Sequence, residues 1–216
     1  MTKKERFERI TEYFQTNMPD AQTELHYESA FQLLCAVMLS AQCTDKRVNM
    51  VTPALFTAYP TPAVMAKATK EDLQHYIGSV SYPNSKAEHL VKMAQQLVER
   101  HGGEVPRGFD ELVALPGVGR KTANVMLSVA FGQAAMAVDT HVFRVSHRIG
   151  LVSDRCTTPY AVEKELVKNI SEKLIPRAHH WLILHGRYVC KSQKPLCNEC
   201  GIRAFCKEWS QCKKNV

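Results

Sequence analysis

The chain has 216 residues, of which 45% are hydrophobic and 23% are charged, and this composition excludes a wholly disordered or collagen-like protein. The length allows either a single large domain or two compact halves. A formal net charge of +7 favours polyanionic partners, although charge alone does not establish binding to nucleic acid.

The N-terminal segment places Phe7, Ile10 and Phe14 at helical spacing, and no long uncharged apolar run follows it. It therefore lacks the pattern of a secretory signal, and no other stretch is long enough to span a membrane. We expect a cytoplasmic protein with reduced thiols. Its eight cysteines are then better interpreted as metal ligands or buried thiols than as disulfides.

Helix signals recur along the whole chain. Apolar residues repeat at spacings of three and four, as in Leu90, Met93 and Leu97, and sustained alternation of period two is missing. Predicted helix starts are the capping-box patterns Thr2 with Glu5 and Ser29 with Gln32, and the Thr-Pro pairs at Thr61 and Thr158. Predicted helix ends are Gly102, Gly132 and Gly150. The sequence predicts an all-α protein.

A glycine-rich turn lies between two predicted helices, where residues 115–123 read Leu-Pro-Gly-Val-Gly-Arg-Lys-Thr-Ala. Its two glycines permit a close approach, and the amides at the following helix start can bind a phosphate oxygen. A bare Pro-Gly-x-Gly is more often only the corner of an αα-hairpin. The complete string, however, resembles the helix-hairpin-helix of the endonuclease III family of DNA repair enzymes. The resemblance implies DNA contacts at Leu115, Gly117, Val118, Gly119 and Arg120.

Lys121 follows this turn directly. An isolated lysine is usually a solvated surface charge, but the resemblance implies that Lys121 attacks the sugar C1′ and expels the damaged base. The resulting Schiff base then undergoes β-elimination, which breaks the 3′ phosphate bond. Relatives that only remove bases lack this lysine, so the resemblance implies both glycosylase and lyase activity.

Asp139 is the second candidate catalytic residue, in the string Val-Asp-Thr-His before an apolar-periodic helix. The residues alone predict a helix N-cap. The resemblance implies an ionised carboxylate that stabilises positive charge on the sugar and assists proton transfer, a role compatible with capping. We also expect His141 and Arg144 to contact DNA. Only the family's fold implies that Lys121 and Asp139 meet in space.

Residues 40–45, Ser-Ala-Gln-Cys-Thr-Asp, resemble a loop of the same family. The resemblance implies that Gln42 enters the duplex where a base is flipped out, and that Thr44 and Asp45 support the site. The residues alone favour a plainer interpretation, in which one helix ends at Ala41 and Thr44 caps the next.

Residues 81–87, Ser-Tyr-Pro-Asn-Ser-Lys-Ala, depart from the family's Gly-Leu-Tyr-Asn-Ser-Lys-Ala. Tyr82 falls on the leucine position and could stack on bases, while Pro83 stiffens the loop. Asn84 and Lys86 match the family and are expected to contact the DNA backbone. We expect this departure to affect the preference for the base opposite the lesion.

Four thiols, Cys190, Cys197, Cys200 and Cys206, lie close together in the sequence. Their chemistry suits either a structural zinc or an iron–sulfur cluster. Their spacing is that of the endonuclease III cluster loop, which implies a [4Fe–4S] cofactor of structural or redox-sensing role, with Lys191 turned to DNA. The remaining cysteines, Cys35, Cys43, Cys156 and Cys212, are interpreted as buried or incidental thiols. The histidines at 179, 180 and 185 are interpreted as part of a packed helix and not as a metal site.

The resemblance covers nearly the whole chain and implies two helical domains with the active site in the cleft between them. We expect a helical barrel over 22–132, with its hairpin at about 110–131, and an iron–sulfur domain made of 1–21 and 133–216. The implied partner is double-stranded DNA that contains oxidised or ring-saturated pyrimidines or abasic sites. The resemblance also implies a monomer that is associated with the nucleoid and does not bind a membrane.

Two alternatives remain open. A monofunctional mismatch glycosylase would share the hairpin and cluster, but Lys121 argues against it, and that group usually bears a further C-terminal domain. A non-catalytic DNA-binding redox sensor would not need both Lys121 and Asp139.

Overall fold

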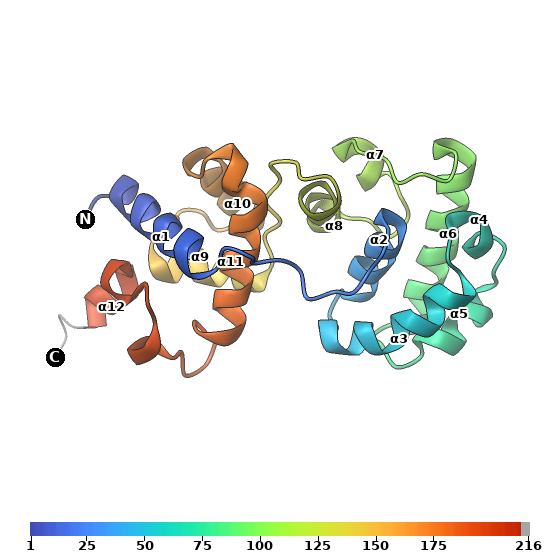
Figure 1. The fold of residues 1–216 in the computed structure, drawn as a ribbon, viewed down its shortest axis with the longest axis horizontal. Helices are drawn as coiled ribbons and strands as arrows, with labels where there is room; N and C mark the ends of the chain where they lie inside the picture. The colour runs from blue at the N-terminus through green and yellow to red at the C-terminus, as the bar shows by residue number, and fades with distance from the viewer. Residues whose placement is uncertain (213–216) are drawn as a thin grey trace. The chain divides into compact units, whose positions relative to one another are not determined.

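The computed structural model describes the backbone of residues 1–212 and the side chains of residues 1–210. Within this part of the chain all regular structure is helical and no strand occurs, which confirms the all-α prediction (Figure 1). No helix in the described part is long and apolar enough to cross a bilayer.

The chain divides into two compact units. The central unit comprises residues 24–131, and the terminal unit comprises residues 1–23 and 132–216. These limits differ by one or two residues from the predicted 22–132 and 1–21 with 133–216. One continuous segment therefore forms the central unit, whereas the two ends of the chain together form the terminal unit.

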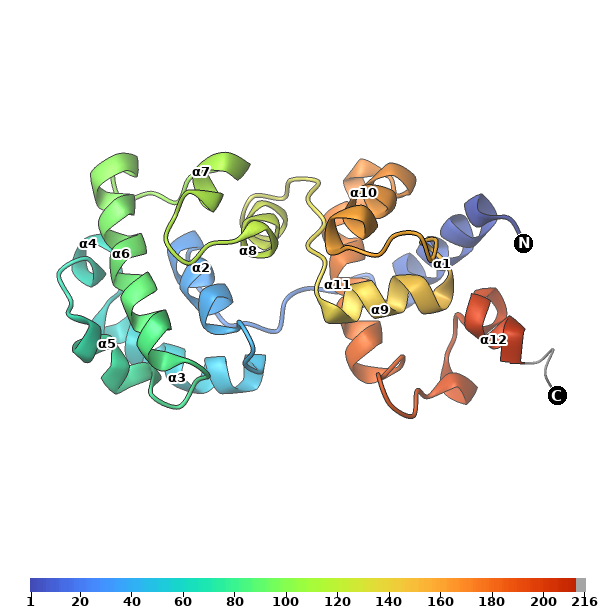
Figure 2. The ribbon, with the colours of Figure 1, turned by 180° about the vertical axis from the view of Figure 1, so that it is seen from behind.

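The terminal unit contains α1 (Lys3–Asn17), α9 (Thr140–Ile149), α10 (Pro159–Asn169), α11 (Ile175–Tyr188) and α12 (Lys207–Cys212), with 3₁₀ turns at Glu172–Leu174, Cys197–Glu199 and Arg203–Phe205. The central unit contains α2 (Ala30–Leu39), α3 (Asp45–Ala58), α4 (Pro62–Met65), α5 (Lys70–Ile77), α6 (Pro83–His101), α7 (Phe109–Val113), α8 (Arg120–Val125) and a π-helical segment at Met126–Ala130. Both views of the ribbon show α1 beside α11, although the two helices stand at opposite ends of the sequence (Figure 2).

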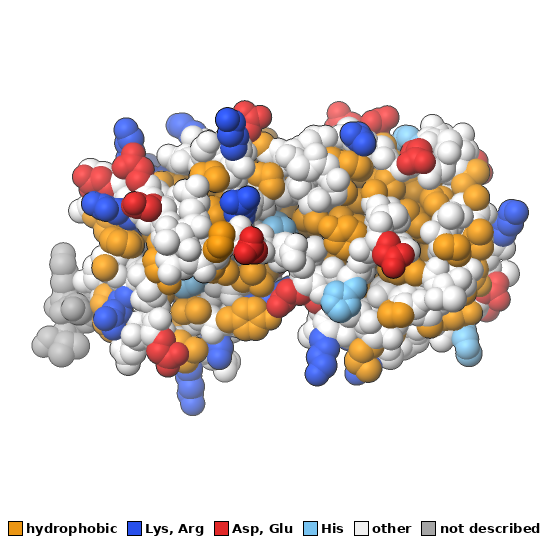
Figure 3. Space-filling view, viewed as in Figure 1, with side chains coloured by type: hydrophobic (Ala, Val, Ile, Leu, Met, Phe, Trp, Pro, Cys, Tyr) orange, Lys and Arg blue, Asp and Glu red, His pale blue; other side chains and the backbone are white. Residues whose placement is uncertain are grey.

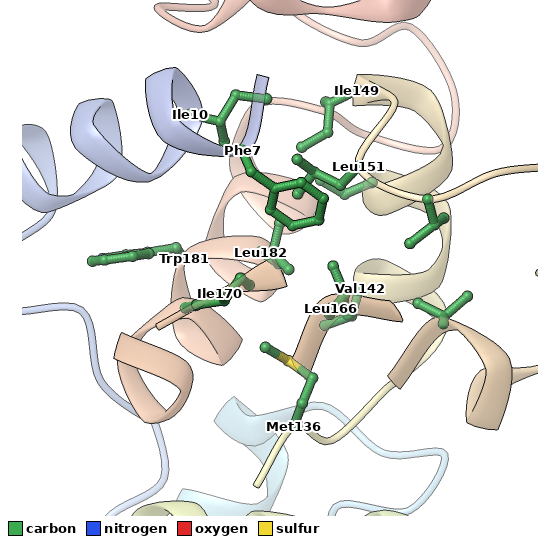
Figure 4. Packing of buried hydrophobic residues seen from close by; sticks show 14 of the residues in the cluster. Phe7, Ile10, Met136, Val142, Ile149, Leu151, Leu166, Ile170, Trp181 and Leu182 are labelled. Carbon is green, nitrogen blue, oxygen red and sulfur yellow. The ribbon is translucent and has the colours of Figure 1, made fainter. Parts of the chain in front are cut away.

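The core of the terminal unit joins α1 to the C-terminal helices. Phe7, Ile10 and Phe14 face inward from α1 at the predicted helical spacing. The ring of Phe14 stacks on that of Trp181 from α11, with centroids 5.8 Å apart. The indole Nε1 of Trp181 also donates to the carbonyl of Met18 at 2.8 Å. Figure 4 shows Phe7 and Ile10 of α1 among buried side chains from the C-terminal helices, such as Leu182, so α1 is part of this core.

The core of the central unit is built around α2. Nine of its ten residues are buried, which is the pattern of a helix that is apolar all round and is surrounded by others. It contacts α3, α6, α8 and the π-helical segment, and the two ribbon views show it inside this unit. The helix α6 turns its apolar stripe of Leu90, Met93 and Leu97 toward the interior.

Most helix boundaries lie at the predicted residues. Thr2 and Glu5 form a complete capping box, and Thr61 and Thr158 cap helices that begin with proline. At Ser29 the box is only half formed, because the Gln32 side chain accepts from the amide of Glu28 instead of that of Ser29. Gly102 and Gly150 end α6 and α9 in the left-handed conformation, with φ of 60° and 81°, which costs glycine little.

Candidate active site and DNA interface

The glycine turn connects α7 to α8 within the central unit. Gly117 has a φ of 78°, and a Cβ there would lie 2.8 Å from the Cβ of His89 and 2.9 Å from the Cε of Met38. Glycine is therefore required at this position by both conformation and packing. A Cβ at Gly119, by contrast, would meet nothing within 4 Å. The turn thus packs its first glycine against the unit and leaves its second glycine open.

The apolar residues of this turn hold it in place. Leu115 and Val118 are buried, and the amide of Val118 donates to the carbonyl of Leu115 at 3.1 Å. Their side chains therefore belong to the protein core, so the DNA contacts predicted for them would have to use main-chain atoms. The guanidinium of Arg120 lies 4.9 Å from the ring centroid of Phe109. This cation–π contact between α7 and α8 fixes the direction of the charged side chain.

Lys121 is exposed on the first turn of α8. Five residues later the helix changes to a π-helical segment, Met126–Ala130. Such widened turns are rare and often lie near functional sites, and nothing in the sequence predicted this one. The hydroxyl of Ser128 within it is buried without a hydrogen-bond partner.

Asp139 begins α9 in the terminal unit. Its Oδ1 accepts a hydrogen bond from the amide of Val142 at 2.8 Å, so the predicted N-cap is confirmed. The residue is only partly buried. Lys121 and Asp139 thus come from different units, each at the start of a helix.

Arg144 occupies the next turn of α9, where its side chain serves the protein interior. Its Nη2 donates to the carbonyl of Gly186 at 2.9 Å and to that of Cys190 at 3.1 Å, and it lies 3.3 Å from Nδ1 of His141. The two carbonyl contacts tie α9 to α11 and to the segment that follows it. The structure therefore favours an internal role for Arg144 over the DNA contact that the sequence predicted.

The turn between α2 and α3 holds the predicted wedge residue. Gln42 is exposed and has a φ of 54°, while Thr44 caps α3 by accepting from the amide of Arg47 at 3.2 Å. The plainer interpretation of this segment, a helix end followed by a fresh cap, is thus confirmed. This cap is compatible with the insertion of Gln42 into the duplex, because Gln42, in the left-handed conformation, projects from the turn. A non-glycine residue in that conformation costs about 1–3 kcal/mol, and such residues cluster at binding sites.

A second exposed turn precedes α6. Tyr82 has a φ of 56° and its side chain is 64% exposed. The exposed Asn84 accepts from Gln74 at 2.6 Å. Lys86, however, is 8% exposed, and its Nζ donates to the carbonyls of Leu39 and Ala41 at 2.8 and 2.6 Å. The structure therefore favours a role inside the protein for Lys86 over the predicted contact with the DNA backbone.

The cysteine segment follows α11 and packs against the core of the terminal unit through Cys190, Cys200 and Cys206. Burial raises the pKa of the Cys200 and Cys206 thiols, and the neighbouring thiols of the set raise both further. Within the described residues, no three His, Cys, Asp or Glu side chains converge on one point as the ligands of a single ion would. Cys35 is fully buried, as predicted, and burial raises its pKa; the side chain of Cys212 lies outside the described residues.

Arg148 supports this segment, a role that the sequence analysis missed. Its guanidinium donates to the carbonyls of Lys191 and Ser192 at 2.6 and 3.0 Å and lies 3.9 Å from Sγ of Cys190. A signal was available, because Arg148 stands one helical turn after Arg144 and on the same face of α9. Lys191 itself is exposed, as its predicted role requires.

The histidines of α11 belong to the packed helix, as predicted. His179 and His185 are 2% and 5% exposed, and His179 Nδ1 lies 3.0 Å from the carbonyl of Ala137. On the face drawn in Figure 3, lysine, arginine and acidic side chains are interspersed and form no single basic patch.

Comparison with known proteins assigns the family. Residues 35–172 match the HhH-GPD superfamily of base excision DNA repair proteins. Endonuclease III of Rickettsia prowazekii (strain Madrid E) is 51% identical over 198 residues, which are 92% of each chain. The chain belongs to the endonuclease III family. Endonuclease III of Escherichia coli (strain K12) is 45% identical over 206 residues, 95% of this chain and 96% of the relative.

Solved structures of endonuclease III extend this similarity to the fold. A trapped endonuclease III–DNA covalent intermediate, in an estranged-adenine complex, matches 99% of this chain and 100% of that one with a TM-score of 0.92 and 43% identity. The predicted function, a base-excision DNA glycosylase and AP lyase that binds damaged duplex DNA, is thereby confirmed at the level of the family.

Proposed function

We propose that this endonuclease III family protein removes oxidised or ring-saturated pyrimidines from duplex DNA and then cleaves the strand 3′ to the abasic site through a Schiff base on Lys121. The observation that supports the proposal most directly is the exposed Lys121 at the start of α8, immediately after the packed Gly117 turn. A lysine there combines an accessible amine with a backbone turn suited to a phosphate.

The chemistry proceeds in two stages. Nζ of Lys121 forms a bond to the sugar C1′ as the bond from C1′ to the damaged base breaks, and the base leaves with a proton. Nζ loses a proton, and the sugar ring then opens: O4′ takes up a proton and the C1′–O4′ bond breaks as the nitrogen lone pair forms the Schiff base. The protonated Schiff base makes the C2′ hydrogen acidic, and its removal expels the 3′ phosphate by β-elimination. In this proposal the Asp139 carboxylate stabilises the positive charge that develops on the sugar and assists the proton transfers.

We infer the DNA contacts from the same geometry. The open Gly119 and the fixed Arg120 face a phosphate, the exposed Gln42 and Tyr82 fill the space of a flipped base, and Asn84 and Lys191 contact the backbone. Because its proposed substrate is chromosomal DNA, we place the protein in the bacterial cytoplasm. We further propose that it acts as a monomer.

Borohydride trapping tests this mechanism. A duplex with one thymine glycol is incubated with the wild-type protein, with Lys121→Ala and with Lys67→Ala, which removes another exposed lysine of the central unit. We expect a reduced covalent complex with the wild type and Lys67→Ala only. Base release without a trapped complex would mean a monofunctional glycosylase, and the absence of any reaction would refute the proposed substrate.

We further propose that Cys190, Cys197, Cys200 and Cys206 hold a [4Fe–4S] cluster, which would supply a structural or redox-sensing centre with no part in the proton transfers. The residues fit this group, because the four partly buried thiols influence one another electrostatically. A cluster takes one thiolate for each iron, so its ligands need not converge on one point as those of a zinc ion must. Iron and acid-labile sulfide at about four each per chain would support the cluster, and one zinc per chain would refute it.

A further inference from the structure

Two exposed turns of the central unit share an unusual backbone. Gln42 and Tyr82 both adopt the left-handed conformation, and within the described residues only one other non-glycine residue, Lys194, has a positive φ. A side chain strains the backbone in this region, so contacts around both turns must hold them there. Both predicted wedge positions are therefore strained and depend on support from neighbouring residues.

A hydrogen bond joins the two turns directly. The hydroxyl of Ser81 donates to the carbonyl of Gln42 at 2.7 Å. Ser81 precedes Tyr82, so this bond joins Gln42 itself to the neighbour of Tyr82. Figure 2 shows the same arrangement in the backbone, with the start of α6 beside the turn between α2 and α3. The bond therefore couples the two turns.

A buried ammonium group makes the second connection. Lys86 lies on the first turn of α6, where its amide donates to the carbonyl of Tyr82 at 3.1 Å. Its Nζ reaches across to the carbonyls of Leu39 and Ala41, at 2.8 and 2.6 Å. These carbonyls lie at the end of α2, where main-chain acceptors lack helical partners and a positive charge is favourable. One side chain therefore caps α2 and anchors both turns.

The solvation of Lys86 supports the same interpretation. Burial lowers the pKa of the ammonium, and the nearby Cys43 opposes that effect. A lysine that contacts phosphate normally keeps its charged end in water, where it remains mobile. The side chain of Lys86 is instead 8% exposed. Its stem and its charge are both held within the protein.

We propose that Lys86 is a positioning residue which, together with Ser81, holds Gln42 and Tyr82 as one rigid pair of wedges for the space vacated by a flipped base. This inference rests on the proposed function of the protein as a glycosylase for damaged duplex DNA. The pair is then formed before DNA binds, so the ordering of two loops does not oppose the opening of the base stack. Tyr82 presents its ring to the unpaired opposite base.

The test compares a substrate that needs the wedge with one that does not. Single-turnover rates are measured for base release from a thymine glycol duplex, and for strand cleavage at an abasic site in single-stranded DNA, where no stacked pair must be opened. Lys86→Met keeps the apolar stem and removes the donor. We expect it to slow the duplex reaction by about ten-fold or more and the single-strand reaction by less than about two-fold.

Two further variants calibrate this result. Lys86→Arg retains donors for both carbonyls and should restore the duplex rate to within about three-fold of the wild type. Lys92→Met removes an exposed lysine of the same helix, paired with Glu88, and should leave both rates unchanged. An unaltered duplex rate for Lys86→Met, or an equal loss on both substrates, would overturn the proposal.

Ser81→Ala keeps the proposal testable even if Lys86→Met does not fold, because it removes only the exposed bond between the turns. We expect a loss of about three-fold on the duplex alone. We also expect a smaller fluorescence change from 2-aminopurine placed opposite the lesion. An unchanged duplex rate and an unchanged fluorescence signal would overturn the proposal.

Borohydride trapping on the abasic strand separates the two proposals. If the wild type is not trapped, the proposed lysine chemistry fails. If the wild type and Lys86→Met are both trapped and only the duplex reaction is slow, the positioning role is supported. If both are trapped and both substrates react at wild-type rates, the positioning role alone fails.

Discussion

Gly117 is the residue on which the shape of the hairpin depends most. A Cβ at this position would strain a φ of 78° and press on His89 and Met38. We therefore expect Gly117→Ala to lower the free energy of unfolding by about 2 kcal/mol or more. Gly119→Ala should cost less than about 1 kcal/mol, because its Cβ meets open space. Urea unfolding of both variants checks this, and equal losses would contradict it.

His180 couples stability to pH. Burial, with a contribution from Arg187, lowers its pKa from the ordinary 6.5 to about 4. The unfolded chain binds a proton in this window while the folded protein does not, so stability is complete above pH 6.5 and falls as the pH is lowered toward 4. Titration of His180 should contribute a loss of about 1–2 kcal/mol between pH 7 and pH 5, measured by urea unfolding at each pH as the difference between the wild type and a variant without this histidine.

The matching variant is His180→Gln, which cannot take up the proton. It should show a smaller loss over the same pH range, because His185, whose pKa burial also lowers to about 4, still contributes. His26→Gln, a substitution at an exposed histidine of the central unit, serves as the control. If His180→Gln and the wild type lose stability equally, His180 is not the coupled group.

At the scale of elements, the N-cap of α9 combines two functions in one residue. Asp139 caps the helix through Val142, and we propose that the same carboxylate acts in catalysis. Asparagine also caps helices but carries no charge. We expect Asp139→Asn to change the free energy of unfolding by less than about 0.5 kcal/mol, whereas Asp139→Ala should lose about 1 kcal/mol.

Both Asp139 variants should lose most of the single-turnover glycosylase rate, by about a hundred-fold or more. Paired measurement of unfolding and of base release therefore separates the cap from the charge. A fully active Asp139→Asn would show that Asp139 has only the structural role.

At the scale of the whole molecule, the chain leaves the terminal unit after α1 and returns to it before α9. The core of that unit needs Phe7, Ile10 and Phe14 from α1. We therefore expect a fragment of residues 24–131 to fold alone, because it is continuous and has its own core around α2. A fragment of residues 132–216 should not fold alone.

Circular dichroism and the cooperativity of thermal unfolding of the two fragments test this difference. Addition of a peptide of residues 1–23 should restore helical signal to the C-terminal fragment. The matched peptide with Phe14→Ala should not, since it loses the contact with Trp181. Independent folding of residues 132–216 would contradict the dependence on α1.

Much of the secondary structure and the family follow from local features of the sequence. Helix starts at Thr2 and Thr158 and helix ends at Gly102 depend on hydrogen bonds within a few residues, so their patterns are readable in the chain. The hairpin string and the cysteine spacing, which indicated the endonuclease III family, are likewise confined to short stretches of the chain. The π-helical segment at Met126–Ala130 had no such local signal.

The direction and environment of individual side chains were decided by tertiary structure. Lys86 and Arg144 resemble DNA-contacting residues in the sequence, yet each donates to carbonyls more than forty positions away in the chain. Spacing cannot indicate such contacts, because the acceptors lie in other segments of the chain. The sequence by itself thus determined the elements, the family and the candidate chemistry. The packing of α6 on α2, and of α9 on α11, decided which charges support the fold and which remain exposed to solvent, because burial depends on neighbours that are distant in the chain.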